Sequence, residues 1–536
     1  MYFRQDNPVL PAAGGSVRPP LPAPRLSDAR RLRIAGALAI ALLVAYGAVL
    51  LLLAPLPLQD LPDHVARAVA MNDLLFHGGS RFGSIFHYRF LFVPYLLGDL
   101  ILTVAVGLWG PVLGGAMWSV LVLLSLPCAV VFYLKVQHTA PDRRVLAVLL
   151  SLYLATDWFF LVGFMSFRLA VAMTIATLAL AELFRRTRSA TRFAAYACAL
   201  VLGYLMHLST VVFVGAALGV AALLRLWTRR TEWRTEIALF APIVAVLMWH
   251  FGVANHYRDA SDPATSPYQW GTLWGKFVRL DSEFIRFAPH SDELMLLALA
   301  ACLFALVGVP NSRQLRNPRV LEALATSAVF MALYFVFPMA YSEAGYVDIR
   351  PLPLASLYLV FACLSVEPQV PTVRTTHATR TWLAVSAAAL LAAVNLAYLT
   401  RHWVADGKWL AQYRAIVASI PTQARVLPIY THGREGHIVP FLHVDSYVAI
   451  DRTGVEPYVF AGDNGNPMKY FRYRHRPYDP PETWYGDVPR GEVSWTAVSR
   501  DYDFLMLTQP FDPKLLRIPT RTVAANSSAA LLAVVK

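Results

Sequence analysis

Long apolar runs recur along most of this 536-residue chain, and they constrain its fold more than any other feature. A helix needs about 20 apolar residues to cross the roughly 30 Å hydrocarbon core of a bilayer, and many of the runs approach that length. The composition agrees, because 57% of the residues are hydrophobic and only 15% are charged, whereas about 25% are charged in soluble domains. The sequence therefore predicts a mainly α-helical bundle that crosses the membrane many times.

The net charge of +13 is explained by membrane topology. Arginines gather in short loops between apolar runs, which is typical of cytoplasmic loops, so we expect no nucleic-acid partner. The pattern predicts about eleven transmembrane helices in an inner (plasma) membrane, a cytoplasmic N-terminus, and a C-terminal domain on the periplasmic or extracellular side. The predicted spans lie near 34–53, 112–134, 145–161, 168–184, 193–206, 208–225, 236–252, 294–309, 320–339, 352–366 and 381–399.

The chain divides into three parts by composition. Residues 1–33 are rich in Pro and Arg and contain no apolar run, which predicts a disordered cytoplasmic tail. Residues 34–400 form the predicted membrane domain, with a long first outer loop at 54–111. Residues 401–536 contain no run long enough to span and predict a small extracytoplasmic α/β domain.

Two apolar stretches need a decision about topology. The run 91–109 would place Arg143 and Arg144 outside if it spanned, so we expect a helix that lies on the outer leaflet or dips into it. The stretch 193–225 is basic at both ends and predicts a hairpin that turns near His207; one long tilted helix is the alternative.

Local patterns also predict the elements of the outer domain and the state of the cysteines. All four cysteines fall inside apolar runs, so no disulfide framework is expected. In the outer domain, alternating apolar residues predict strands, and one intervening segment predicts a helix. The strands are expected at 425–430, 502–508 and 529–535, and the helix at 437–452.

Ionisable residues follow the first apolar run directly. Asp60, Asp63, His64 and Arg67 lie within eight positions of one another, at the point where the chain leaves the membrane. Acidic groups near hydrocarbon are costly unless they pair, face water or have a function. Two structural explanations remain open: Asp60 as a helix N-cap, and an exposed Asp63–Arg67 pair at i, i+4.

The segment Asp63-His-Val-Ala-Arg-Ala68, followed by Phe92-Val-Pro-Tyr-Leu-Leu97, resembles the GT-C superfamily of integral-membrane glycosyltransferases. His64 stands where that family commonly has Glu. The resemblance covers roughly residues 30–400 in layout, and an outer domain after the last span is also usual in the family. It implies a polyprenyl-phosphate sugar donor, a site at the outer face of the bilayer, and no cofactor.

The resemblance also implies roles for individual residues. A carboxylate can take the proton of an acceptor hydroxyl, and Asp63 is the candidate base, with Asp60 as the alternate. An arginine can stabilise charge on a leaving phosphate, and Arg350 is the candidate for the donor phosphate, together with Tyr346. The possible lining residues of the site are His64, Arg67, Tyr95, His207, His256 and Arg258.

We expect no metal site, because His432, His437 and His443 do not have the spacing of a zinc centre. The predicted function is transfer of a sugar from a polyprenyl-phosphate donor to an acceptor hydroxyl of a glycan, lipid or protein. A secondary transporter or lipid flippase is one alternative, although no internal repeat is evident. A non-catalytic membrane scaffold is the other, and it predicts no effect of substituting Asp60 or Asp63.

Overall fold

The computed structural model describes ten segments of the chain, and all structural statements below concern these residues. They are 26–228, 232–256, 268–307, 312–341, 345–366, 374–430, 438–462, 470–480, 493–508 and 516–536. The disordered tail was predicted over residues 1–33, and its residues up to 25 lie outside the described segments. For residues 26–33 the prediction is wrong, because the helix α1 spans Leu26–Leu52.

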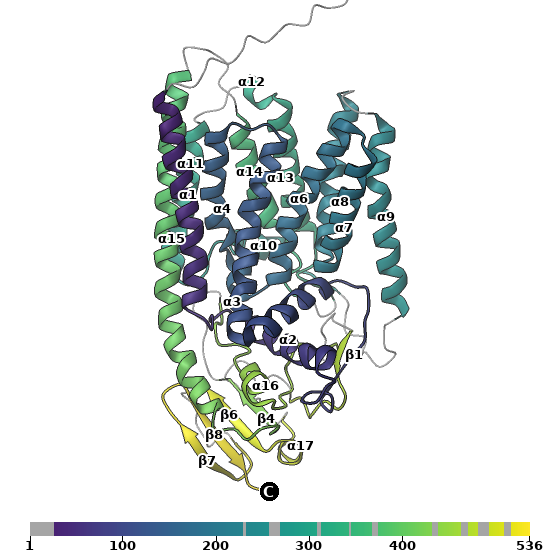
Figure 1. Cartoon of the computed structure of the whole chain (residues 1–536), viewed down its shortest axis with the longest axis vertical. Coiled ribbons are helices and arrows are strands. Elements are labelled where there is room, and N and C mark those ends of the chain that lie inside the picture. Colours follow the sequence, from purple (N-terminus) through teal and green to yellow (C-terminus); the bar gives the residue numbers. More distant parts are fainter. Residues whose placement is uncertain are drawn as a thin grey trace, which may run out of the picture.

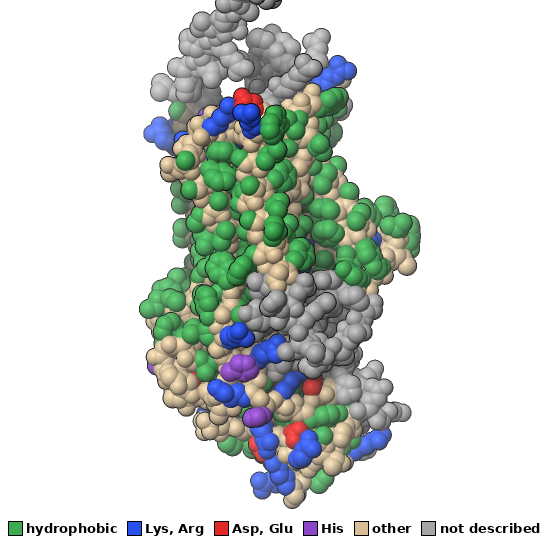
Figure 2. Space-filling view, turned by 90° about the vertical axis from the view of Figure 1, so that its right-hand side faces the viewer, with side chains coloured by type: hydrophobic (Ala, Val, Ile, Leu, Met, Phe, Trp, Pro, Cys, Tyr) green, Lys and Arg blue, Asp and Glu red, His purple; other side chains and the backbone are tan. Residues whose placement is uncertain are grey.

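A bundle of long helices makes up most of the molecule (Figure 1). Figure 2 shows hydrophobic side chains over the bundle, with Lys and Arg gathered toward its two ends, as expected for a protein surrounded by lipid. The chain is therefore a multi-pass membrane protein. The bundle contains α1, α3 (Leu96–Val136), α4 (Pro141–Ala155), α6 (Met165–Thr187), α7 (Ala190–Met206), α8 (Ser209–Trp227), α9 (Trp233–His256), α11 (Pro289–Val307), α13 (Pro318–Val336), α14 (Leu352–Ser365) and α15 (Arg374–Val417).

Each predicted span coincides with part of one of these helices. Within the described segments, eight helices are long and apolar enough to cross a membrane, and α7 and α14 are shorter apolar helices. The helix α4 has only 15 residues, so the count of eleven stays a prediction. The hairpin prediction is confirmed, since α7 ends at Met206 and α8 begins at Ser209.

The helix α3 changes direction near its start. Gly110 has φ 75° and ψ 169°, and Pro111 follows it. This left-handed conformation is open to glycine without steric cost, and it breaks the helix between two segments. The predicted interfacial run 91–109 corresponds to the segment before the break, and the predicted span 112–134 to the segment after it.

Several short elements connect the long helices of the bundle. The helix α2 (Leu61–Phe76) lies across the ends of the long helices (Figure 1). The other short elements in the membrane half are α5 (Trp158–Val162), α10 (Leu273–Val278), α12 (Ser312–Leu315) and the two-stranded sheet of β2 (Tyr268–Gln269) and β3 (Ala340–Tyr341).

The C-terminal domain contains a four-stranded mixed sheet in the order β4-β6-β8-β7. The strands β4 (Val426–Ile429) and β6 (Phe504–Thr508) are parallel, while β8 (Ala529–Val534) is antiparallel to both β6 and β7 (Thr520–Ala525). The three predicted strands are confirmed. The predicted helix is shorter than expected and forms α16 (Ser446–Arg452), and the structure adds β7 and α17 (Trp495–Asp501).

A long helix and a pair of strands help to join this domain to the membrane half. The helix α15 continues to Val417, so the boundary predicted at residue 400 falls inside it; Arg401 and His402 are polar but are compatible with an unbroken helix. The strand β1 (Phe86–Tyr88) of the first outer loop pairs with β5 (Phe471–Tyr473) of the C-terminal domain. The domain is therefore docked onto the first outer loop.

Candidate functional site

The first outer loop places Asp60 and Asp63 at the start of α2. Pro62 occupies the first helical turn, where its missing N–H costs nothing. Asp60 holds the N-cap position, but its side chain makes no capping hydrogen bond, so the simple capping explanation does not hold. Its backbone N–H instead donates to the carbonyl of Val162, at 2.8 Å.

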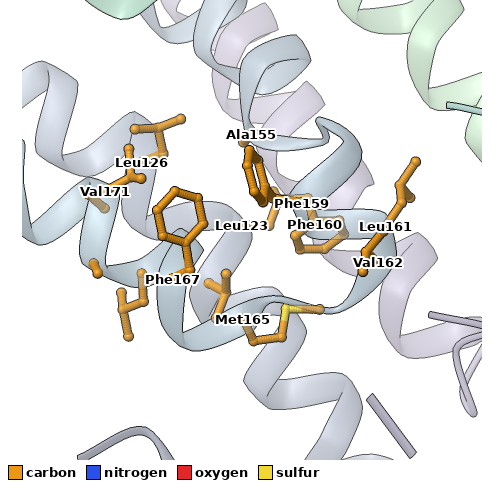
Figure 3. Close-up of a cluster of buried hydrophobic side chains, with 14 of the residues drawn as sticks. Leu123, Leu126, Ala155, Phe159, Phe160, Leu161, Val162, Met165, Phe167 and Val171 are labelled. Carbon is orange, nitrogen blue, oxygen red and sulfur yellow. The ribbon is translucent and has the colours of Figure 1, made fainter. Parts of the chain in front are cut away.

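This backbone contact depends on Gly163. Gly163 has φ +91°, and a Cβ atom on it would lie 2.9 Å from the backbone nitrogens of both Asp60 and Leu61. Any larger residue would push the two segments apart. The α5 segment is fixed from its other side by a buried apolar cluster drawn from α3, α5 and α6, which includes Leu123, Phe159, Phe160, Met165 and Phe167 (Figure 3).

The two carboxylates meet His443 of the C-terminal domain. The Nδ1 atom of His443 lies 3.0 Å from Oδ2 of Asp63, and its Nε2 atom lies 3.7 Å from Oδ1 of Asp60. Ser446 donates from Oγ to Oδ1 of Asp63, at 2.7 Å. Oδ2 of Asp63 has no hydrogen bond in the described residues, so its contact with His443 is an ion pair. Asp63 is fully buried, while Asp60 is 6% exposed.

Burial and mutual charge shift the protonation of this cluster. Burial, with a contribution from Asp63, raises the pKa of Asp60 to about 7, although His443 opposes the rise. Burial alone would lower the pKa of His443, but Asp63 and Asp60 outweigh it and raise that pKa to about 9. At neutral pH the cluster therefore holds an imidazolium beside a carboxyl group that is close to half ionised.

Arg67 has a different partner from the one that its spacing suggests. Its Nε and Nη2 atoms donate to the two oxygens of Asp99, at 2.8 and 2.6 Å, and both side chains are buried. Tyr470 of the C-terminal domain also donates to Asp99. The explanation of Asp63 and Arg67 as an exposed ion pair is therefore wrong. Arg67 is buried, and its pair with Asp99 fixes α2 to the start of α3.

His64 lies beside this pair. Its Nδ1 atom accepts from Arg67 at 2.9 Å, and burial together with the Arg67 charge keeps its pKa well below the usual value. His64 is therefore neutral. Its ring meets that of Phe460, of the C-terminal domain, edge to face.

A second cluster surrounds Arg350. Arg350 Nη1 lies 3.0 Å from Nε2 of His207, and the Tyr95 hydroxyl lies 3.1 Å from the same nitrogen. A guanidinium can only donate, so Nε2 accepts from Arg350. The other ring nitrogen, Nδ1, lies 2.7 Å from Oγ of Ser209 and 3.1 Å from the backbone nitrogen of the same residue. Burial and the nearby Arg350 charge keep the pKa of His207 well below its usual value.

Aromatic rings and a backbone carbonyl surround the Arg350 guanidinium. It lies over the rings of Phe164 and Phe167, each at 5.8 Å, and Nη2 donates to the carbonyl of Gly345. Its Nε atom is buried and has no hydrogen-bond partner in the described segments. Tyr346 is 46% exposed, and its ring lies edge-on to Trp158 at 4.9 Å.

The segment from Val162 to Phe164 joins the two clusters. Val162 and Gly163 contact Asp60, and Phe164 contacts Arg350 and Tyr346. The structure thus brings Asp60 and Arg350 to two sides of one short segment. Of the other candidates, Arg258 lies outside the described residues, and the side chain of His256 is not described.

Within the described segments, no group of three or more His, Cys, Asp or Glu side chains is arranged to hold a metal ion. His432 and His437, which entered the zinc argument, lie outside those segments. His443 binds carboxylates instead.

Sequence reasoning missed four residues that complete the first cluster: His443, Ser446, Asp99 and Tyr470. Asp99 did carry a signal, because an acid inside an apolar helix requires a partner. The other three come from the C-terminal domain, more than 370 positions from their partners, and no local pattern marks them.

Comparison with known proteins assigns the fold. No family model matches the chain, and no curated protein matches its sequence. The crystal structure of ArnT from Cupriavidus metallidurans in the apo state matches with a TM-score of 0.55 and 13% identity, over 95% of this chain and 98% of that chain. The same protein bound to undecaprenyl phosphate matches with a TM-score of 0.54 and 13% identity, over 93% and 97% of the two chains.

An oligosaccharyltransferase from Archaeoglobus fulgidus, in a complex with Zn and sulfate, gives a TM-score of 0.41 and 10% identity, over 87% of this chain and 68% of that one. The assignment rests on the ArnT structures, which cover nearly the whole of both chains. Because ArnT is a GT-C glycosyltransferase, the chain described here has the GT-C fold, as its sequence resemblance predicted.

Proposed function

We propose that this chain, which has the GT-C fold, transfers a sugar from a polyprenyl-phosphate donor to an acceptor hydroxyl at the outer face of the membrane. The observation that carries the proposal is the arrangement of Asp60 and Arg350 on two sides of the segment from Val162 to Phe164. One side offers a carboxylate for proton transfer and the other a cation for a phosphate. The undecaprenyl phosphate bound by ArnT supports the class of donor.

The reaction breaks the bond between the anomeric carbon and the phosphate oxygen, and it forms a bond from that carbon to the acceptor oxygen. The acceptor hydroxyl loses its proton to a carboxylate as the new bond forms. The electron pair of the broken bond leaves with the lipid phosphate. A guanidinium beside that phosphate stabilises the charge that develops on it.

Between the two candidate bases we favour Asp60. Oδ1 of Asp63 accepts from Ser446, and its buried Oδ2 faces the His443 ring at 3.0 Å without forming a hydrogen bond. Asp63 is fully buried, whereas Asp60 is 6% exposed, and Gln59 and His443 both approach Oδ1 of Asp60. A general base works best with a pKa near the working pH, and the pKa of Asp60 is about 7.

For the donor phosphate we propose Arg350, supported by Tyr346. The Nε atom of Arg350 lacks a hydrogen-bond partner in the described segments, and an arginine can offer two parallel N–H groups to a phosphate. His207 contacts Nη1 of Arg350 through its Nε2 atom, and the Tyr95 hydroxyl contacts the same histidine nitrogen. Together they hold the guanidinium in place. Tyr95 and His207 are therefore positioning residues in this proposal.

The test is transfer of radiolabelled sugar from polyprenyl-phosphate donors by the full chain in lipid nanodiscs. We expect kcat/KM to rise with pH through about 7, as Asp60 loses its proton. Asp60→Asn should reduce kcat by about a hundredfold or more, and Arg350→Gln should raise KM for the donor as well as reduce kcat.

Two results would count against the proposal. Full transfer activity in both Asp60→Asn and Asp63→Asn would remove the carboxylate from the mechanism. If the wild-type chain binds a polyprenyl phosphate but transfers no sugar from any donor in the panel, the scaffold or flippase alternative takes its place.

A further inference from the structure

His443 is a buried, charged side chain that the C-terminal domain contributes to the acidic cluster. Its two ring nitrogens face two different carboxylates, at 3.0 Å for Asp63 and 3.7 Å for Asp60. The ring is also fixed from the side by Phe460, whose centroid lies 4.8 Å away in an edge-to-face arrangement. The imidazole therefore bridges Asp60 and Asp63 of the first outer loop.

The backbone at this position is strained, which indicates a constraint. His443 has φ +66°, a left-handed conformation that residues other than glycine rarely adopt. Such a conformation persists where the surrounding structure enforces it. Here the strained residue directly precedes the turn that delivers Ser446 to Asp63.

The charges around the ring make His443 the cation that balances the acids. Asp60 and Asp63 face it from the first outer loop, and Asp445 faces it from its own domain. His64 also lies near but is neutral. Arg67 is the other nearby cation, and its charge is matched by Asp99.

Tyr430 and Glu456, which lie next to Asp445, add no positive charge to the cluster. Tyr430 donates a hydrogen bond to Asp445, and burial raises the pKa of Glu456 well above its usual value. Burial also raises the pKa of Asp445 to about 6. The only positive charge that lies directly between Asp60 and Asp63 in the described residues is that of His443.

We propose that His443 is a positioning residue of the transferase site, whose imidazolium bridges Asp63 and Asp60 and thereby sets the charge of the catalytic carboxylate. This inference rests on the proposed function. Ser446 holds Asp63, Asp63 faces the ring, and the charge of the ring favours the ionised form of Asp60. The C-terminal domain then supplies part of the active site, and the site is complete only when that domain is docked.

The first experiment is the pH profile of kcat/KM for His443→Asn. Asparagine tolerates the left-handed backbone but carries no charge. An opposite charge this close typically shifts a carboxyl pKa by about 1 to 3 units, so the acidic limb should move to higher pH by about that amount. Activity at pH 7 should fall about tenfold or more, and much of it should return near pH 9.

The matched control is His475→Gln, because His475 is an exposed histidine of the same domain; its profile should coincide with that of the wild type. A uniform loss of activity in His443→Asn, with the acidic limb at the wild-type pH, would overturn the proposal and leave His443 a structural residue.

A second measurement does not depend on activity. Nitrogen-15 NMR of histidine-labelled protein in nanodiscs reports the charge of each ring, and His443 should remain an imidazolium up to about pH 9. Asp63→Asn should lower that midpoint, which also identifies the signal if His443→Asn does not fold. A His443 ring that is neutral at pH 7 would overturn the proposal, whereas a charged ring in a chain without transferase activity would overturn only the proposed function.

Discussion

Arg67 and Arg188 show how strongly the environment decides what one ion pair contributes. Arg67 pairs with Asp99 where both side chains are almost completely buried. Arg188 pairs with Glu232 where the two side chains are 57% and 60% exposed. Removing one partner of a buried pair leaves a charge without compensation, while an exposed pair is screened by water.

We predict that Arg67→Met lowers the free energy of unfolding by about 3–5 kcal/mol, measured by thermal or denaturant unfolding in detergent. Arg188→Met should change it by less than about 1 kcal/mol. The double variant Arg67→Met with Asp99→Leu should recover much of the loss, since an apolar pair can replace a buried ion pair. Equal effects of the two arginine variants would contradict this account.

At the scale of elements, the sequence contained most of the membrane half. Runs of apolar residues located the helices, and basic residues at both ends of 193–225 located the hairpin between α7 and α8. The break at Gly110 falls between the predicted run 91–109 and the predicted span 112–134, but the direction of the second segment was not predicted, because a Gly-Pro pair indicates where a helix stops and not where the chain goes next. Nor was β7, whose residues are mostly exposed and lack a buried alternating face.

The α5 segment carries the second prediction, at Gly163. Gly163→Ala places a Cβ 2.9 Å from two backbone nitrogens and forces φ +91° on a residue that disfavours it. We expect the Asp60 segment to move, with a loss of at least about tenfold in kcat, because small misplacements of catalytic groups are costly. The measurement is the same sugar-transfer assay.

Gly219→Ala is the matched control, because Gly219 lies within α8 and has open space where the Cβ would be. Alanine is favoured over glycine inside a helix by about 0.5–1 kcal/mol, so this variant should keep full activity and unfold at the same or a higher temperature. Wild-type activity in Gly163→Ala would show that the close approach to Asp60 is dispensable.

At the scale of the whole molecule, the candidate site depends on contacts that no local pattern reveals. Asp60 and Arg350 were predicted as site residues from the outer loops. In the structure they contact the same short segment, from Val162 to Phe164. His443, Ser446 and Tyr470, which complete the first cluster, come from a domain that the sequence showed only as a separate α/β unit. Docking of that domain depends on contacts between residues far apart in the sequence, and the periodicity of apolar residues within a segment carries no information about such contacts.

Docking should respond to pH through His443, which is our third prediction. The pKa of His443 in the folded chain is about 9, above its ordinary value of 6.5. A raised pKa of a base means that its stabilising contribution is fully present below about 6.5 and is lost as pH rises through about 9. The unfolding temperature of the wild type should therefore exceed that of His443→Asn most clearly near pH 6, and the gap should narrow by pH 10.

His475→Gln provides the reference for this comparison, because His475 is an exposed histidine of the same domain. A gap between wild type and His443→Asn that widens above pH 9 would contradict the assigned sign.

The pairing of β1 with β5 gives the last prediction, because it fixes how the two halves of the molecule meet. His87 faces Arg472 in this antiparallel pair, within the register that joins Phe86 to Tyr473 and Tyr88 to Phe471. Directly opposed residues have Cα atoms about 5.5 Å apart or closer, which suits a disulfide. His87→Cys with Arg472→Cys should therefore cross-link under mild oxidation, detected by mass spectrometry of the linked peptides.

The offset pair His87→Cys with Arg474→Cys is the matched control, since a shift of two residues lengthens the separation to about 7–8 Å and should leave the thiols free. If the docked domain is the one that supports transfer, as His443 requires, the cross-linked protein should keep its activity. A cross-link that forms readily but abolishes transfer, with activity restored by reduction, would show instead that the domain must leave the first outer loop during turnover.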